Sequence, residues 1–65
     1  MNRLDLHGIR HHDVDRIVEN FVLLNKPPIR IITGNSDRMI ELVVKVLDRH
    51  NINYERFKPG QITIL

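Results

Sequence analysis

Two stretches with helical periodicity, each preceded by a short strand-like segment, constrain the fold of this sequence most. Apolar residues recur at helical spacing from residue 11 to about residue 25, and again from about residue 37 to residue 50. Such spacing is typical of helices that bury one face. Residues 3–7 alternate between polar and apolar, and residues 29–32 are rich in β-branched side chains, as strands are. A strand, a helix and a second strand in succession form a crossover with parallel strands, so the pattern predicts an α/β domain.

The end of the chain predicts a hairpin. Residues 54–57 and 61–65 have strand patterns, and Lys58-Pro59-Gly60 between them places Pro and Gly as a type II turn prefers. The expected order is therefore βαβαββ, in one domain over residues 1–65. We expect a two-layer sandwich, in which two helices cover one face of a four-stranded mixed sheet. The alternation in residues 3–7 leaves the other face polar and open.

The two helices have candidate boundaries in the sequence. Asn35 or Ser36 is the natural N-cap of the second helix. Asn51 or Asn53 can adopt the left-handed conformation that follows a helix. The two prolines after Lys26 end the first helix, because a proline ring disfavours helical geometry at the residue before it.

Size and composition exclude several classes of protein. A 65-residue chain buries only roughly 60% of its surface on folding, so we expect a monomer or a weak homodimer. With no cysteine there is no disulfide, thiolate metal site or thiol nucleophile. The start lacks the apolar run of a signal peptide, and the longest apolar stretch, residues 21–24, is far too short for a membrane span. We therefore expect a cytoplasmic protein without a membrane partner. A net charge of +2 permits contact with a polyanion but does not require it.

The junction after the second strand is a candidate anion site. In open α/β sheets ligands bind at the carboxyl ends of the parallel strands, where Thr33, Gly34, Asn35 and Ser36 stand. Gly34 allows close approach of a ligand to the backbone, and the N–H groups that begin the next helix attract anions. The alternative is that Gly34 only makes the turn and Ser36 only caps the helix. The chain has no Walker pattern.

The junction after the first strand is a candidate for acid–base chemistry. Asp5 and His7 are two residues apart, so on a strand both side chains leave the same face. A carboxylate beside an imidazole fixes its tautomer and raises its basicity. The alternative is a surface histidine that happens to lie near an aspartate. If the first two strands are neighbours, this junction and the Gly34 junction lie within roughly 5–10 Å of each other.

Other charged residues give weaker signals. Arg3, Arg30 and Arg56 are expected on the open face of the sheet, either to bind a polyanion or simply as solvated charge. His11 and His12 could join His7 in a metal site, but Gly8 interrupts any helix between them. The spacing of four residues between His7 and His11 is therefore not a helical one. We therefore expect no bound metal.

The motifs at the two junctions resemble those of one known family. Leu4-Asp5-Leu6-His7-Gly8 resembles the LDLHG signature that opens Smr (small MutS-related) domains. Ile32-Thr33-Gly34 resembles the start of their second motif, TGxG or HGxG, and Ser36 stands where that motif has its last glycine. The spacing, the helix between the motifs and the closing hairpin also match, so the resemblance covers nearly the whole chain.

This resemblance implies a fold like the C-terminal domain of translation initiation factor three. It also implies binding to DNA or RNA, with endonuclease activity in several members. The family's Asp and His tied to cleavage correspond to Asp5 and His7, with Gly34 in the second motif. A side chain at Ser36 narrows the approach that a glycine would allow.

We therefore expect a nucleic-acid-binding domain that cuts the backbone of RNA or DNA. His7 would act as general base or acid, and Asp5 would orient it. Backbone amides from Gly34 to Ser36 would hold the phosphate charge, with Gly8 beside them. RNA cleavage through the 2′-hydroxyl requires no cofactor, whereas attack by water on DNA favours a divalent cation.

Two alternatives remain open on the sequence. One is a non-catalytic adaptor that docks on a nucleic-acid or ribosomal surface. The other is a small enzyme acting on a phosphorylated metabolite, which would need a pocket closed to polymers.

Overall fold

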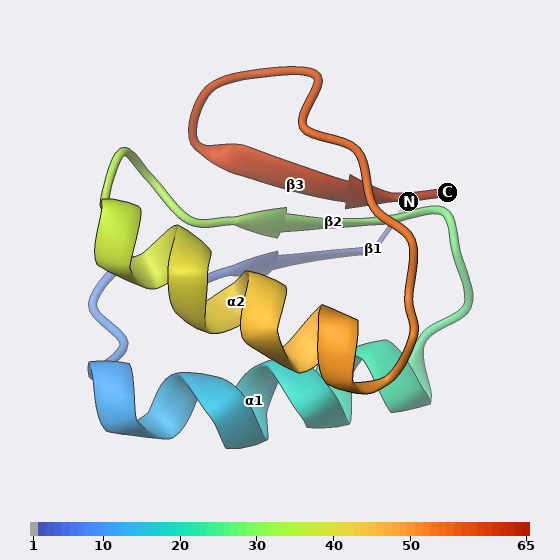
Figure 1. Ribbon diagram of the computed structural model, residues 1–65, viewed down its shortest axis with the longest axis horizontal. Helices are drawn as coiled ribbons and strands as arrows, with labels where there is room; N and C mark the ends of the chain where they lie inside the picture. Colours follow the sequence, from blue (N-terminus) through green and yellow to red (C-terminus); the bar gives the residue numbers. More distant parts are fainter. Residues whose placement is uncertain (1) are drawn as a thin grey trace.

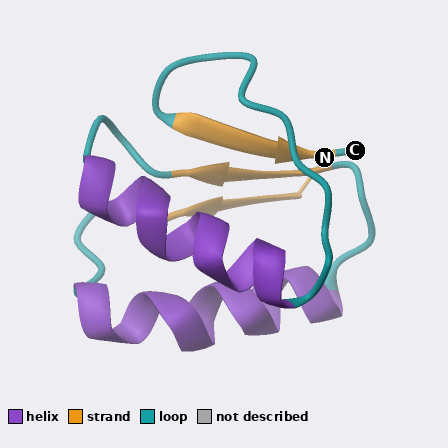
Figure 2. Cartoon of the chain, viewed as in Figure 1, coloured by secondary structure: helices purple, strands orange, loops and turns teal. Residues whose placement is uncertain are grey.

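A computed structural model of the chain describes residues 2–65. Its elements are β1 (Asn2–Asp5), α1 (His11–Leu24), β2 (Ile29–Ile32), α2 (Asp37–Arg49) and β3 (Gln61–Ile64). β2 is the central strand of a mixed sheet, since it pairs in parallel with β1 and antiparallel with β3. Both helices lie on the same side of this three-stranded sheet (Figures 1 and 2). The expected α/β class is thus confirmed. No helix within residues 2–65 is long and apolar enough to cross a membrane.

The fourth strand expected over residues 54–57 is reduced to a single bridge. Glu55 pairs with Thr63 on the outer edge of β3, and the residues after Glu55 then leave the sheet. The cause lies in Gly60, whose carbonyl accepts two backbone hydrogen bonds, of 2.8 and 3.1 Å, from the residues that follow β2. The start of β3 is therefore held against the end of β2 and not against residues 54–57. The segment that precedes β3 runs past the edge of that strand in Figure 1. The element order is βαβαβ, and the prediction of a fourth strand was wrong.

The boundaries of α2 follow from side chains at its ends. Ser36 is the N-cap, and its Oγ accepts a hydrogen bond of 3.1 Å from the Met39 N–H. At the other end Asn51 has a φ of 57°, and the N–H of the next residue donates to the Leu47 carbonyl at 2.9 Å. This is a Schellman motif. Both predicted caps are therefore confirmed, for Ser36 at the start and for Asn51 at the end.

α1 has no comparable cap at its start. The residue before His11 makes no side-chain hydrogen bond to the helix. At the C-terminal end, the Asn25 side-chain amide donates to the Phe21 carbonyl at 2.9 Å, and the helix stops at Leu24 before the two prolines.

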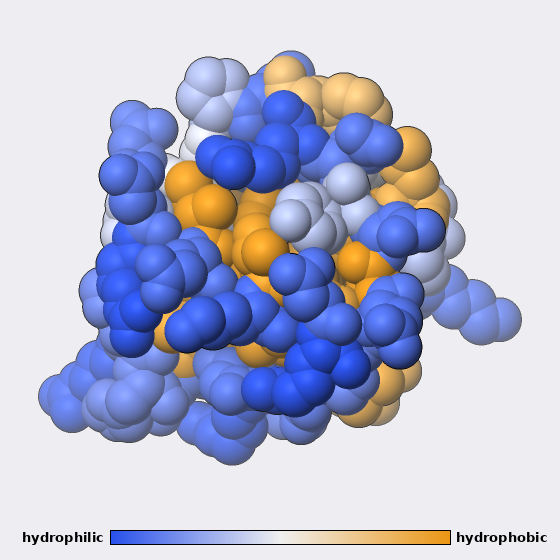
Figure 3. Space-filling model, in the orientation of Figure 1, coloured by the Kyte–Doolittle hydropathy of each residue, from blue (hydrophilic) through white to orange (hydrophobic). Residues whose placement is uncertain are grey.

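The core lies between the helices and one face of the sheet. Leu4, Ile31 and Ile62 are cross-strand neighbours, so they form one row on the helix-covered face. Arg3, Arg30 and Thr63 form the next row, which faces the other way. On the side viewed in Figure 3 hydrophilic residues cover most of the surface, with hydrophobic residues visible in the middle. The buried apolar side chains are Leu6, Val14, Val18, Ile29, Ile31, Met39, Val43, Val46, Leu47, Ile62 and Ile64.

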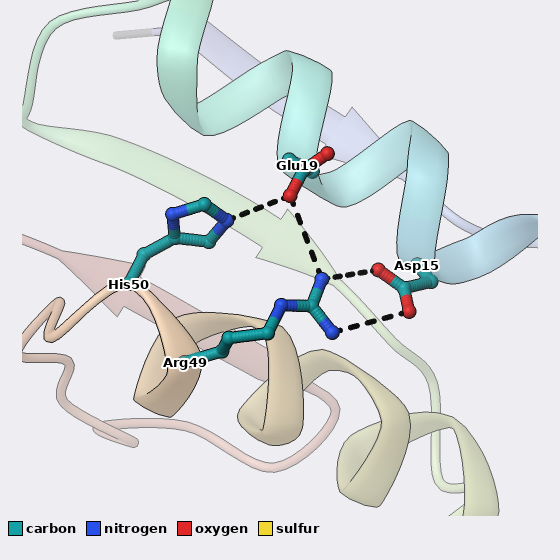
Figure 4. A network of polar contacts seen from close by, with 4 residues as sticks. All are labelled: Asp15, Glu19, Arg49 and His50. Carbon is teal, nitrogen blue, oxygen red and sulfur yellow. Dashed lines mark hydrogen bonds and ion pairs between the residues drawn. The ribbon is translucent and has the colours of Figure 1, made fainter.

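Charged side chains join the two helices at the surface (Figure 4). Arg49 of α2 donates to both carboxylate oxygens of Asp15 in α1, at 2.5 and 3.3 Å, and lies 3.5 Å from Glu19. Glu19 also contacts His50 Nε2 at 2.8 Å. The hydrogen bond between Arg49 and Asp15 lowers the pKa of Asp15 and raises that of Arg49. The network holds the C-terminal end of α2 against α1.

Candidate functional site

The structure brings the two candidate junctions together at the carboxyl ends of β1 and β2. The Leu6 N–H donates to the Ile32 carbonyl at 2.9 Å, which extends the parallel pairing by one residue beyond β1. The next side chain, His7, lies over Gly34: a Cβ placed on Gly34 would be 3.3 Å from His7 Nε2. The imidazole and the glycine turn are therefore in direct contact.

Asp5 positions the imidazole through two hydrogen bonds. Its Oδ1 accepts the backbone N–H of His7 at 2.9 Å and faces the ring Nδ1 at 2.5 Å. The first bond makes an Asx turn, which ends β1 at Asp5 rather than at His7 as the alternation predicts. The two side chains therefore meet because of this turn, and not because they share one face of a strand.

The charge of Asp5 determines which ring nitrogen of His7 is available. Hydrogen bonds from the His7 backbone, and then from its ring, hold the pKa of Asp5 below its usual value of 3.8. The carboxylate is thus ionised at neutral pH and can only accept hydrogen bonds. Nδ1 must therefore carry a proton, which leaves Nε2 to exchange a proton with a ligand. The side chains of His7 and Asp5 are 67% and 60% exposed, so a polymer can reach them.

Gly8 serves the backbone turn that follows. It has a φ of 79°, and the Ile9 N–H donates across it to the Leu6 carbonyl at 3.1 Å. A Cβ added to Gly8 would meet no atom within 4 Å. Gly8 is therefore needed for its left-handed conformation rather than for close contact with a neighbour.

Part of the second junction is used inside the fold, which corrects the expected phosphate site. The N–H groups of Thr33 and Gly34 both donate to the Gly60 carbonyl, at 2.8 and 3.1 Å. The buried Thr33 hydroxyl donates to the Gly34 carbonyl at 3.0 Å. Neither the Thr33 side chain nor the Gly34 amide is thus free to hold a phosphate.

Gly60 is the residue of this site that the sequence analysis missed. A Cβ added to it would lie 3.4 Å from backbone atoms of Gly34, so the two loops pack directly on each other. The available signal was the Pro59-Gly60 pair, which predicted a turn but not which strand the turn would support.

The remaining part of the second junction stays exposed. Asn35 and Ser36 lie on the surface, and no backbone hydrogen bond within residues 2–65 uses their N–H groups. The first N–H groups of α2 likewise have no partner within the helix. The Ser36 hydroxyl is occupied by the helix cap, and the exposed carboxylate of Asp37 stands in the first turn. The anion site thus consists of backbone amides beside one acidic side chain.

Arg3 and Arg30 lie as expected on the open face, directly opposite each other in the register of β1 and β2. They stand two residues before Asp5 and Ile32, a distance of about 7 Å along the strands. Arg56 lies outside any strand. The arginines of β1 and β2 thus border the Asp5–His7 pair on its sheet side.

Metal-binding residues do not gather at the site. Within residues 2–65 no group of three or more His, Cys, Asp or Glu side chains is arranged to hold a metal ion. His11 and His12 lie exposed at the start of α1.

Compared with family models, with curated proteins and with solved structures, the chain gives no match.

Proposed function

We propose that the chain is a Smr-type domain that binds RNA or DNA and cleaves its phosphodiester backbone. The proposal includes a cytoplasmic protein, monomeric or weakly dimeric, related in fold to the C-terminal domain of translation initiation factor three. The observation that carries it is the ionised Asp5 carboxylate on His7 Nδ1, with Nε2 beside the Gly34 turn. An oriented imidazole next to exposed backbone amides is the arrangement that acid–base cleavage of a phosphate ester needs.

With RNA, the strand supplies its own nucleophile. His7 Nε2 accepts the proton of the 2′-hydroxyl while that oxygen attacks phosphorus. The bond from phosphorus to the 5′-oxygen breaks, and the departing oxygen takes a proton from solvent. The products are a 2′,3′-cyclic phosphate and a 5′-hydroxyl.

With DNA, water replaces the 2′-hydroxyl as nucleophile and gives its proton to His7. The broken phosphorus–oxygen bond leaves a phosphate end and a hydroxyl end, the latter after uptake of a proton. A divalent cation in this case would stabilise the charge that develops on the phosphate.

The phosphate charge is held by groups that differ partly from the expected ones. The N–H groups of Asn35 and Ser36 and those that begin α2 replace the Gly34 amide, which the fold uses. Arg3 and Arg30 add positive charge on the sheet side. Phosphate contacts of this kind position a strand without reading its sequence.

The test is cleavage of labelled single-stranded and duplex RNA and DNA, with and without EDTA. We expect His7→Ala to lower the cleavage rate by roughly 10²–10⁴-fold, as for loss of a general base, and Asp5→Asn to lower it less. His11→Ala is the matched control, because His11 is exposed in α1 and makes no side-chain hydrogen bond within the described chain. Cleavage that persists at full rate in His7→Ala would disprove the proposed mechanism.

A second candidate is a non-catalytic adaptor on a nucleic-acid or ribosomal surface. The observation that favours it is the negative Asp37 carboxylate, together with a Ser36 hydroxyl that is used by the helix cap. Both reduce the strength of the anion site. Salt-dependent binding without cleavage of any substrate, and unchanged binding in His7→Ala, would support the adaptor instead.

A further inference from the structure

A hollow lies on the open face of the sheet, away from the helices. Its volume is about 210 Å³, smaller than the roughly 300–1,000 Å³ of pockets that enclose whole drug-sized ligands. It can therefore take one ring system of a larger ligand rather than a complete metabolite. The residues around it are Arg30, Phe57, Lys58, Gln61, Thr63 and Leu65.

The chemistry around this hollow combines an aromatic ring with unpaired cations. Phe57 is 66% exposed, although apolar residues of this size are usually buried. Arg30 and Lys58 make no ion pair within residues 2–65, and the buried Nε of Arg30 has no hydrogen-bond partner. By contrast, the ion-paired arginines and lysine of the described chain, which are Arg16, Arg38, Lys45 and Arg49, all lie on the helices.

We propose that the hollow binds one unpaired base of a single-stranded nucleic acid. The base stacks on Phe57, and Arg30 and Lys58 contact the phosphates on either side. The amide of the half-buried Gln61 is available to the edge of the base, and the buried Thr63 forms part of the lining. Stacking of bases on exposed aromatic rings in a cationic groove is how proteins hold single strands.

The hollow suits a nucleic acid better than an added peptide strand. A peptide would bind by pairing with the nearest free strand edge. The edge of β3 beside the hollow is already used, since Glu55 and Thr63 exchange backbone hydrogen bonds of 2.7 and 2.8 Å. Among the side chains that line the hollow two are cationic and none is acidic, which favours a polyanion.

The position of the hollow connects it to the Asp5–His7 site. Asp5 pairs with Ile32, and Ile32 pairs with Gln61, so Gln61 lies in the same row of the open face. Because neighbouring strands are about 4.8 Å apart, the backbones of Asp5 and Gln61 are roughly 10 Å apart. A short segment of an extended single strand can span this distance. The inference rests on the proposed function in taking a nucleic acid as the ligand, and it adds that the substrate is single-stranded next to the cleaved bond.

The test uses short single-stranded RNA and DNA oligonucleotides and abasic versions with the same number of phosphates. Binding is followed by NMR with His7→Ala protein, so that no strand is cut. We expect the base-containing strands to bind about tenfold or more tightly than the abasic ones, with shifts at Phe57 and Gln61. Phe57→Ala should remove this difference, and Phe57→Tyr should keep it. Leu23→Ala is the matched control, because Leu23 is 65% exposed but lies on α1.

The charge contribution is tested separately. Arg30→Gln should weaken the binding of base-containing and abasic strands alike. It should also reduce the slope of the logarithm of the binding constant against the logarithm of the salt concentration by about one. Lys45→Gln makes the same change of charge on α2, where Lys45 lies 3.7 Å from Glu41, and should weaken binding less.

The inference is wrong if abasic and base-containing strands bind equally, if Phe57→Ala binds as the parent protein does, or if oligoglutamate of equal charge produces the same shifts. The proposed catalysis fails separately, when wild-type protein shows base-dependent binding but cuts no substrate. If wild-type protein cleaves and Phe57→Ala leaves both KM and kcat unchanged, the catalytic proposal stands and this inference falls.

Discussion

Gly34 has a φ of 70° and lies under the ring of His7, so two separate constraints favour glycine at this position. An alanine would strain the backbone, and its Cβ would also press on Nε2 from 3.3 Å. Gly8 has a similar φ of 79° but open space where a Cβ would be. The two glycines therefore separate the effect of backbone strain from the effect of contact with the imidazole.

We predict that Gly34→Ala and Gly8→Ala each destabilise the fold by about 1–2 kcal/mol, the cost of a left-handed non-glycine residue. Only Gly34→Ala should also displace the His7 ring and weaken its hydrogen bond to Asp5. Urea unfolding gives the first quantity, and the NMR signals of the His7 ring nitrogens give the second. Equal changes in the His7 signals of both variants would contradict the contact.

The charge of Asp5 makes a second prediction, on pH. Because its pKa is lowered on folding, its contribution to stability is fully present above its usual value of 3.8 and is lost as the pH falls through the folded value. Asp5→Asn keeps an oxygen for the Asx turn but removes the charge. We therefore expect Asp5→Asn to be less stable than the parent protein at about pH 6 and to approach it in stability as the pH falls below 3.8. A stability difference in urea unfolding that is constant over this pH range would show that the charge is not responsible.

At this scale the sequence predicted part of the site. The order Asp5-Leu6-His7-Gly8 identified the acid–base pair, because both groups lie next to each other in the chain and meet through a local turn. The hydrogen bonds from the Thr33 and Gly34 N–H groups to the Gly60 carbonyl were not predictable, since they depend on a contact between segments far apart in sequence. Contacts between neighbouring residues could thus be predicted from the sequence. Competition between distant segments for the same backbone N–H groups could not.

The helices and strands differ in how well local signals define them. The ends of α2 are set within one turn by the Ser36 side chain and the left-handed backbone of Asn51, and each was one of two candidates that the sequence predicted. Residues 54–57 have a strand pattern and lie in register with β3 at Glu55, yet only that residue pairs. Strand formation depends on whether a partner edge is held nearby, and here the Gly60 carbonyl directs the start of β3 toward β2.

The Ser36 cap carries a prediction for α2. Ser36→Ala should lower the free energy of unfolding by about 1 kcal/mol, because the Met39 N–H loses its acceptor. Ser36→Gly should cost only a few tenths of a kcal/mol and should open the approach to the amides that begin the helix. Thermal or urea unfolding measures both, with Asn35→Ala as a control that removes an exposed side chain without a cap. If Ser36→Ala and Asn35→Ala are equally mild, the cap does not stabilise the helix.

The whole molecule depends on a small core, and its stability should be limited accordingly. At about 0.05–0.15 kcal/mol per residue, a chain of 65 residues has roughly 3–10 kcal/mol of stability. Leu47 is completely buried between α2 and the sheet, whereas Leu24 is 81% exposed at the end of α1. Replacing each of these leucines with alanine therefore compares the loss of a buried side chain with the loss of an exposed one.

We predict that Leu47→Ala costs about 2–5 kcal/mol, enough to unfold much of the protein at physiological temperature. Leu24→Ala should change stability by less than about 0.5 kcal/mol. Circular dichroism during urea unfolding compares the two. A mild effect of Leu47→Ala would mean that helix α2 is not packed as described.

The ends of the described chain lie close together (Figure 1), and His7 follows the other end of β1. Asn2 pairs with Ile29, and Ile29 pairs with Ile64, so only one strand separates the two ends. A gap of roughly 10 Å can be closed by about three or four extended residues. In a circularly permuted variant, or in one inserted into a loop of a carrier protein, the end of the sheet next to His7 would therefore lie away from the new connection.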